Sequence, residues 1–157
     1  MIYAGCDPGL NGALAFFDIE KGNLSVVDMP TVEVKRGAKM KREVSPAGVA
    51  NILRIAGRID MLILERVNAM PGQGVSSVFS FGRSAGIIEG CVAALNIPMT
   101  IVPPQTWQKA VNLRGGKDGS RQRAMELFPI HGALFARKRD DGRADASLMA
   151  WFAAMAK

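Results

Sequence analysis

The stretch DMLILE, residues 60–65, limits the possible folds of this chain more than any other feature. Its four central residues are all apolar, so neither side of the segment suits water. The run is short for a buried helix, and an uninterrupted apolar run of this length is typical of a strand covered on both faces. Such strands occur in sheets that carry helices on both sides, so the sequence predicts an α/β fold.

The segments around this strand supply the rest of the sheet and its helices. Ser45 followed by Pro46 predicts a helix start, because serine caps helices and proline suits their first turn. The basic stretch 32–42 is expected to be a loop or an irregular extension. We therefore expect a mixed five-stranded sheet with helices on both faces. The expected strands are 1–6, 12–17, 24–28, 60–65 and 98–102, and the expected helices are 46–59, 75–95, one from 104, 120–128 and 140–156.

Composition bounds the number of domains and the compartment. A chain of 157 residues, 48% of them hydrophobic, predicts one domain spanning residues 1–157. No apolar run approaches the roughly 18 residues of a membrane span and no signal-peptide pattern is present, so a cytoplasmic protein is expected. Cys6 and Cys91 lack metal-ligand spacing, and we expect reduced thiols. His131 has no partner in sequence, which disfavours a histidine base or a zinc site.

The charge indicates a polyanionic partner. The net charge is +6 at pH 7 and the pI is about 9.7. The basic residues form three runs, and each run lies beside glycine and an expected loop. One such run is usually a solvated surface, whereas three favour contacts with a phosphate backbone. The runs are VKRGAKMKR (34–42), LRGGKDGSRQR (113–123) and ARKRDDGR (136–143).

Two acids lie where predicted strands end. Asp7 follows an apolar strand and precedes Pro8 and Gly9, and one interpretation is a tight turn whose carboxylate accepts hydrogen bonds from backbone N–H groups. Glu65 ends the MLILE strand, where it could reach solvent or pair with Arg66. In α/β sheets, however, functional side chains gather where strands end and loops begin, so both acids are site candidates.

The last predicted helix carries two acids on its apolar side. At about 100° per residue, Asp141 lies about 20° from Leu148 on the helical wheel, and Asp145 about 60°. Asp140 lies about 80° from Leu148, and Arg143 points away. Acids in a first turn favour the helix dipole, which explains Asp141 but not an inward Asp145 one turn later. Unpaired buried carboxylates are costly unless a cation relieves the cost, so the pair predicts a metal site.

Together these acids predict a metal-dependent nuclease. Hard oxygen ligands without histidine or cysteine suit Mg²⁺, with Mn²⁺ able to substitute, and disfavour zinc. Two such ions about 4 Å apart activate water and stabilise the leaving oxygen of a phosphodiester. The predicted ligands are Asp7, Glu65, Asp141 and Asp145.

Several motifs resemble those of the RuvC-type Holliday-junction resolvases, particularly the phage and prophage forms. They are GCDPGLNGALAFFD, LILERV, AMPGQGVSSVFSFGR, VPPQTWQKAV, GKDGSRQRA and DGRADASLMA, and they cover nearly the whole chain. The resemblance implies an RNase H-like fold, a homodimer, and two active sites that nick a four-way DNA junction symmetrically. Carried over by position, the family's metal ligands correspond to Asp7, Glu65, Asp141 and Asp145, and a basic residue near the scissile phosphate corresponds to Lys117.

The chain departs from the cellular members of that family at three points. Their last two acids are three residues apart, whereas Asp141 and Asp145 are four apart, and both spacings stay on one helix face. A second basic residue aligns near Trp107, which leaves Lys109 as a possible substitute. The aromatic residues that follow the family's glutamate are missing here, and Met70 is the large apolar candidate in that stretch.

Other functions stay open at the level of sequence. A non-catalytic junction-binding protein would keep the basic surface but would need no inward acids. An RNase H-like nuclease on other branched or structured nucleic acids would keep both. An actin-like ATPase also begins with an Asp-Gly turn, but it needs two such domains, and this chain is too short.

Overall fold

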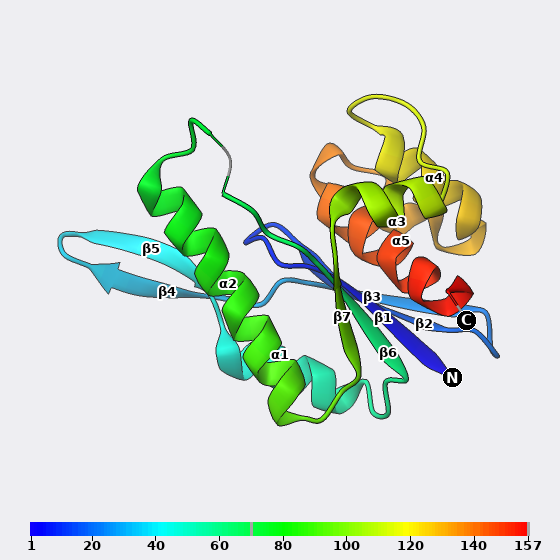
Figure 1. Ribbon diagram of the computed structural model, residues 1–157, viewed down its shortest axis with the longest axis horizontal. Helices are drawn as coiled ribbons and strands as arrows, with labels where there is room; N and C mark the ends of the chain where they lie inside the picture. The colour runs from blue at the N-terminus through cyan, green and yellow to red at the C-terminus, as the bar shows by residue number, and fades with distance from the viewer. Residues whose placement is uncertain (70, 157) are drawn as a thin grey trace.

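The computed structural model describes residues 1–69 and 71–156, and a mixed five-stranded sheet forms its centre (Figure 1). The strand order is β3-β2-β1-β6-β7. The first three strands form an antiparallel meander, and β6 and β7 run parallel to β1. The strands are β1 (Ile2–Asp7), β2 (Ala13–Asp18), β3 (Asn23–Asp28), β6 (Met61–Glu65) and β7 (Met99–Val102).

The central strands are buried on both faces, as the apolar runs predicted. In β1, Tyr3 belongs to the core on one side of the sheet, and Ala4 and Cys6 belong to the core on the other side. In β6, Ile63 belongs to the first core and Leu64 to the second. Because side chains alternate along a strand, the odd-numbered residues of both strands face the first core.

Helices cover both faces of the sheet, which confirms the predicted architecture. On the first-core side lie α3 (Pro104–Ala110), α4 (Gly119–Leu127) and α5 (Asp141–Met155), and on the second-core side lie α1 (Pro46–Ile55) and α2 (Val75–Ala94). The Ser45 hydroxyl accepts a hydrogen bond from the N–H of Gly48 at 3.1 Å, which is the predicted cap. The helix ends at Ile55, four residues before its predicted end, and Gly57 follows in the left-handed region with φ +76°.

The last helix packs directly on the first strand. A Cβ atom placed on Gly5 of β1 would lie 2.1 Å from the Ala146 carbonyl oxygen and 2.6 Å from the Ala150 nitrogen. Only glycine permits this approach of α5 to β1. This contact determines how closely α5 approaches β1 near the carboxyl end of the strand.

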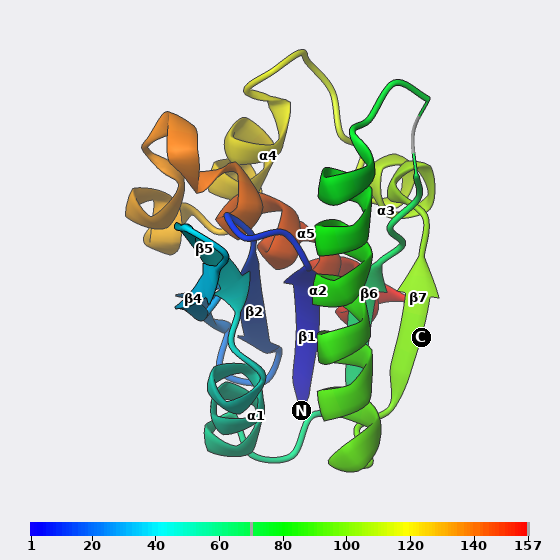
Figure 2. The ribbon, with the colours of Figure 1, turned by 90° about the vertical axis from the view of Figure 1, so that its left-hand side faces the viewer.

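The basic stretch is a β-hairpin, so the expectation of a loop was wrong. Strands β4 (Thr31–Arg36) and β5 (Lys39–Val44) pair with each other and with no other described strand. Two residues connect them, and Gly37 has φ +62°, as tight hairpin turns require. The hairpin extends away from the five-stranded sheet, beside the first half of α2 (Figures 1 and 2).

Short 3₁₀ helices at Pro129–Phe135 and Lys138–Asp140 join α4 to α5. His131 lies in the first of them, where its Nε2 accepts a hydrogen bond from the N–H of Leu24 at 3.3 Å, so this histidine has a structural role. Cys6 and Cys91 are free thiols, as expected. Within the part of the chain described, no helix is long and apolar enough to cross a membrane.

Candidate active site

Asp7 and Glu65 lie side by side at the carboxyl ends of two neighbouring strands. Cys6 pairs with Leu64 in the parallel register of β1 and β6, so the next residue of each strand is one of the two acids. Both acids have odd numbers and therefore face the side of the sheet that α5 covers. Asp7 also accepts a hydrogen bond from the Gly9 N–H at 3.2 Å, so the tight-turn interpretation is correct as well.

The start of α5 brings a third carboxylate to these two. A Cβ atom on Gly142 would lie 3.0 Å from Asp7 Oδ2 and 2.5 Å from the Asn11 carbonyl oxygen, so the helix begins against the Asp7 turn. Asp145 follows Gly142 by three residues and lies on the same helix face. Its Oδ1 atom is buried and has no hydrogen-bond partner among the described residues.

Burial raises the pKa values of all three carboxyl groups, and repulsion from neighbouring acids adds to the shift in Glu65 and Asp145. The pKa of Glu65 rises to about 7, first because of burial and then because of the nearby charge of Asp7. The pKa of Asp145 rises to about 6, again mainly through burial; a hydrogen bond from Ser120 lowers this pKa, and repulsion from Asp7 and Asp141 raises it further. Burial also raises the pKa of Asp7. These groups are therefore close enough to disfavour one another's ionised form.

A buried tryptophan holds one of the carboxylates. Trp107 of α3 is fully buried, and its indole Nε1–H donates a hydrogen bond to Glu65 Oε2 at 3.0 Å. This bond lowers the pKa of Glu65 against the larger effect of burial. No sequence pattern predicts this bond, because the two residues are 42 positions apart. Trp107 therefore orients Glu65 toward the other acids.

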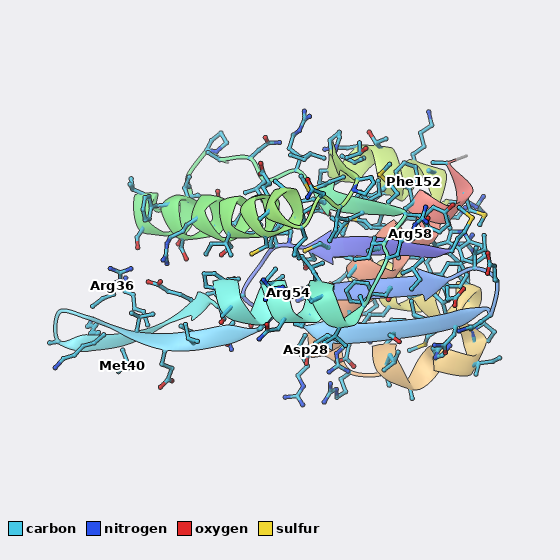
Figure 3. All side chains as sticks on the ribbon, turned by 90° about the horizontal axis from the view of Figure 1, so that it is seen from below. Asp28, Arg36, Met40, Arg54, Arg58 and Phe152 are labelled. Carbon is cyan, nitrogen blue, oxygen red and sulfur yellow. The ribbon has the colours of Figure 1, made fainter. Side chains whose placement is uncertain are left out.

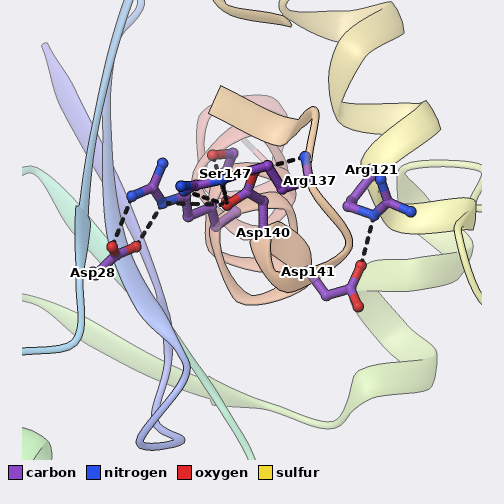
Figure 4. Close-up of polar contacts among 7 residues, drawn as sticks. Asp28, Arg121, Arg137, Asp140, Asp141 and Ser147 are labelled. Atoms are coloured by element: carbon purple, nitrogen blue, oxygen red, sulfur yellow. Dashed lines mark hydrogen bonds and ion pairs between the residues drawn. The ribbon is translucent and has the colours of Figure 1, made fainter. Parts of the chain in front are cut away.

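Asp141 occupies a different environment from the three inward acids. The helical wheel placed it on the buried side of α5, but as the first residue of the helix its side chain is 52% exposed. Its Oδ1 accepts a hydrogen bond from Arg121 Nε of α4 at 2.9 Å (Figure 4). Arg121 also pairs with Asp118. Asp141 lies beside the acid cluster, and its assignment as a metal ligand stays a prediction.

Asp140 is part of the scaffold. It is 1% exposed, although the helical wheel turned it away from the apolar stripe. The reason is that Arg137, three residues earlier, encloses it: Asp140 Oδ2 accepts a bond from the Arg137 N–H at 2.8 Å, and Oδ1 accepts one from the guanidinium at 2.8 Å. Nearby, Arg143 forms a double hydrogen bond with Asp28 of β3 at 2.5 and 2.7 Å (Figure 4).

Both predicted basic residues are exposed to solvent. Lys117 is exposed in the α3–α4 loop, and Lys109 is exposed on α3. The α3–α4 loop and the β6–α2 loop both rise at the end of the molecule where β1 and β6 terminate (Figure 2). A role for Lys117 or Lys109 at a scissile phosphate stays a prediction, and Met70 lies outside the described residues.

A wide groove of about 1650 Å³ opens beside the acids and extends to the hairpin. Asp7, Asp141 and Asp145 line it at one end. The groove also collects cations from three separate parts of the chain, namely two of the basic runs and α2, which the sequence alone does not connect. These cations are Arg36, Lys41, Arg42, Arg83, Arg137, Arg139 and Arg143.

The donor set fits a hard divalent cation. A buried carboxylate oxygen without a partner and elevated carboxyl pKa values are what a cation site looks like before the cation neutralises it. Among residues 1–69 and 71–156, no three Asp, Glu, His or Cys side chains already converge closely enough to hold a metal ion. Repulsion between the acids and the bonds from Trp107 and Arg121 account for this spread.

The comparisons with known proteins agree with this fold. The architecture is the RNase H-like α/β fold, and it is shared with RuvC of Thermus thermophilus. The structure of that protein in complex with a Holliday junction substrate matches with a TM-score of 0.64 at 14% identity, covering 99% of this chain and 96% of that one. A second Thermus thermophilus RuvC structure matches with a TM-score of 0.59 at 17% identity, covering 99% and 97%.

Similarity in sequence is weaker and more local. The chain is 27% identical over 118 residues to the chloroplastic Holliday junction resolvase MOC1 of Chlamydomonas reinhardtii. The match covers 74% of this chain but only 13% of that protein. No family model matches the chain. The fold is therefore shown, and the activity is argued from the site.

Proposed function

We propose that this protein is a divalent-metal-dependent endonuclease that resolves four-way DNA junctions. The observation that carries the proposal is the unpartnered, buried carboxylate oxygen of Asp145, which faces Asp7 and Glu65 at the end of a basic groove. A protein that only binds DNA has no reason to keep this costly group. The resolvase named in the sequence match and the junction bound in the Thermus structure support four-way junctions as the substrate.

The residues of the chain have distinct tasks in this reaction. Asp7, Glu65 and Asp145 would hold Mg²⁺, or Mn²⁺ in its place, and Asp141 would join them after leaving Arg121. Two bound ions would supply an activated water and stabilisation of the leaving oxygen. Trp107 keeps Glu65 aimed at the site, and the groove cations neutralise the phosphates that approach it. Lys117 is the proposed basic residue near the scissile phosphate.

We also propose that the protein acts as a homodimer through α2. Val75 is 87% exposed and Phe79 is 72% exposed on one face of this helix. Added Cβ atoms at Gly82 and Gly86, on the same face, would meet nothing within 4 Å, so a second helix has room to approach closely. A two-fold dimer matches the two-fold symmetry of a junction and would place paired nicks symmetrically. Light scattering at micromolar concentration should give twice the mass of the chain.

One cleavage experiment tests the function. The purified protein with Mg²⁺ is offered a four-way junction, a linear duplex, a flap and an RNA–DNA hybrid of matched sequence. We expect symmetric nicks in the junction and little cleavage of the other substrates. Equal cutting of the flap or hybrid would favour an RNase H-like nuclease of broader substrate range. Tight junction binding without cleavage would favour a non-catalytic junction-binding protein. The resemblance to the phage branch stays a prediction that this panel does not address.

A further inference from the structure

The β4–β5 hairpin has two chemically different faces. Arg36 and Met40 point to opposite sides of it (Figure 3). Lys35 is directly opposite Met40 in the register, so these two side chains share one face, which we call the back face. Arg36 and Lys41 line the groove, and we call their side the groove face. Neighbouring lysines of one small hairpin therefore lie in different surroundings.

Polar contacts tie the hairpin to both walls of the groove. Glu43 of β5 accepts a bond from Arg36 Nε at 3.0 Å, and its other oxygen pairs with Arg83 of α2. At the base of the hairpin, Arg42 donates to the Leu10 carbonyl at 3.3 Å and also to the Asn11 side chain, both in the turn that follows Asp7. These contacts hold the hairpin in a fixed position relative to α2 and to the turn that follows Asp7.

These contacts leave specific cations free. Arg36, Arg42 and Arg83 each bond to a described residue, whereas Lys35 and Lys41 form no hydrogen bond or ion pair with any described residue. Glu43, the acid of the hairpin that lines the groove, is shared by two arginines. The hairpin end of the groove therefore keeps a net positive charge, while the acids gather at its other end.

The construction of the hairpin suits an extended polyanion. Isolated two-stranded hairpins are marginally stable, and most side chains of this one are exposed, so it contributes little to the core. Six residues per strand at about 3.3 Å each reach roughly 20 Å, which is about six steps of a DNA duplex. The α2 wall opposite presents serine hydroxyls, which contact phosphates readily. Those serines are Ser76, Ser77 and Ser80.

We propose that the groove face of the hairpin binds the sugar–phosphate backbone of the duplex arm that leaves the active site. Lys41 contacts a phosphate of this arm, Arg36 and Arg83 shape the groove, and Lys35 on the back face takes no part. The inference rests on the proposed function, since it assigns a surface to one arm of the junction substrate. It also makes the sequence-based expectation more specific, because the sequence alone did not distinguish between the cations of residues 34–42.

Two single substitutions test the assignment, because each removes one lysine charge from the same hairpin. Lys41→Ser changes the groove face, and Lys35→Ser changes the back face. Junction binding is measured in Ca²⁺ over a range of salt concentrations, and melting curves check that both variants stay folded. For Lys41→Ser we expect about fivefold weaker binding and a log–log salt slope smaller by about 0.9. For Lys35→Ser we expect both values to stay at the wild-type level.

A chemical change in the DNA tests the contact from the other side. Neutral methylphosphonate linkages are placed in one arm at increasing distances from the exchange point. Wild-type protein and Lys35→Ser should lose affinity when the neutral linkage lies within about six steps. Lys41→Ser should show no further loss there, because the contact is already absent and the two changes are not additive.

The outcomes separate this inference from the proposed function. Wild-type cleavage of the junction together with an unchanged salt slope in Lys41→Ser would overturn the hairpin assignment alone. Equal losses in both variants would also overturn it, because they would show an effect of overall charge without a preferred face. A wild-type protein that neither binds nor cuts junctions would overturn the proposed function and this inference with it.

Discussion

The acid cluster and the hairpin are built in different ways: the acids lie between closely packed elements, whereas the hairpin is mostly exposed. The acids are held between a sheet and a helix that meet without spare room, at Gly5 and at Gly142. The hairpin stands in solvent and is held by a few polar contacts through Glu43 and Arg42. Metal chemistry needs ligands fixed within fractions of an ångström, whereas a phosphate backbone can be met by exposed, adaptable lysines. Catalysis and binding should therefore be separable by mutation.

The largest expected effect is a loss of cleavage without a loss of binding. Asp7→Asn, Glu65→Gln and Asp145→Asn each keep the shape of the side chain and remove a hard anionic ligand. Cleavage in Mg²⁺ should fall by several orders of magnitude, whereas junction binding in Ca²⁺ should be retained or slightly improved. Because one of several repelling buried charges is gone, the melting temperature of the metal-free protein should rise. A near-normal cleavage rate in Asp7→Asn would refute the proposed nuclease site.

Asp140→Asn is the matched control for those variants. It changes an acid beside the cluster that belongs to the scaffold, so it should lower the melting temperature by several degrees through the lost pairing with Arg137. At a temperature where the variant is folded, cleavage should stay within a few-fold of wild type. The ligand variants and Asp140→Asn would then change the melting temperature in opposite directions, and only the ligand variants would lose cleavage.

A smaller effect is expected at Trp107, which touches the site without being a ligand. Trp107→Phe keeps a buried aromatic ring and removes the N–H that holds Glu65. Residues that orient a metal ligand typically contribute 10- to 100-fold, so cleavage should fall by about that factor and should require more Mg²⁺. Trp151→Phe is the control, since Trp151 packs against Phe17 and Phe128 and touches no acid of the site. Equal cleavage rates and Mg²⁺ requirements for the two variants would show that Trp107 does not contribute to the site.

The smallest expected effect is in the pH dependence of stability. The pKa values of about 7 for Glu65 and about 6 for Asp145 lie above those of unfolded carboxyl groups, so the native state binds more protons than the unfolded state between about pH 4 and 7. The free energy of unfolding of the metal-free protein should therefore decrease as the pH rises through this range. We expect a fall of about 5 °C in melting temperature between pH 5 and 8.

Glu65→Gln shows whether the site causes that fall. The variant lacks the group with the higher pKa, so its melting temperature should change less over the same range. Mg²⁺ binds the ionised acids and should reduce the fall in the wild-type protein as well. Parallel pH profiles for the variant and the wild type would show that Glu65 does not titrate as described.

Sequence reasoning succeeded where a single periodicity decides the structure. The apolar run at 61–64 predicted a doubly buried strand, and the position of Asp7 and Glu65 at strand ends marked both acids as site candidates. It failed for the hairpin, because the apolar alternation there is limited to Val32 and Val34, the rest of residues 31–44 is mostly charged, and only Val44 is buried. The strands there are defined by a two-residue turn and by pairing with each other.

The missed parts of the site share a different cause. Trp107 meets Glu65 across 42 positions, and Arg121 meets Asp141 across 20 positions. The burial of Asp140 depends on the conformation of a 3₁₀ helix, which a wheel drawn for an α-helix does not represent. Each of these contacts joins polar groups from separate elements, and no period in the sequence encodes it.

The packing of α5 against β1 also determines when the protein can become active. Asp7 belongs to β1 and Asp145 to α5, so ribosomal synthesis adds Asp145 well after Asp7. A nascent chain that ends before residue 141 contains the hairpin, but it lacks α5 and therefore one of the proposed metal ligands. On the proposed function, cleavage requires α5 to dock on β1, so activity should recover during refolding no earlier than this docking.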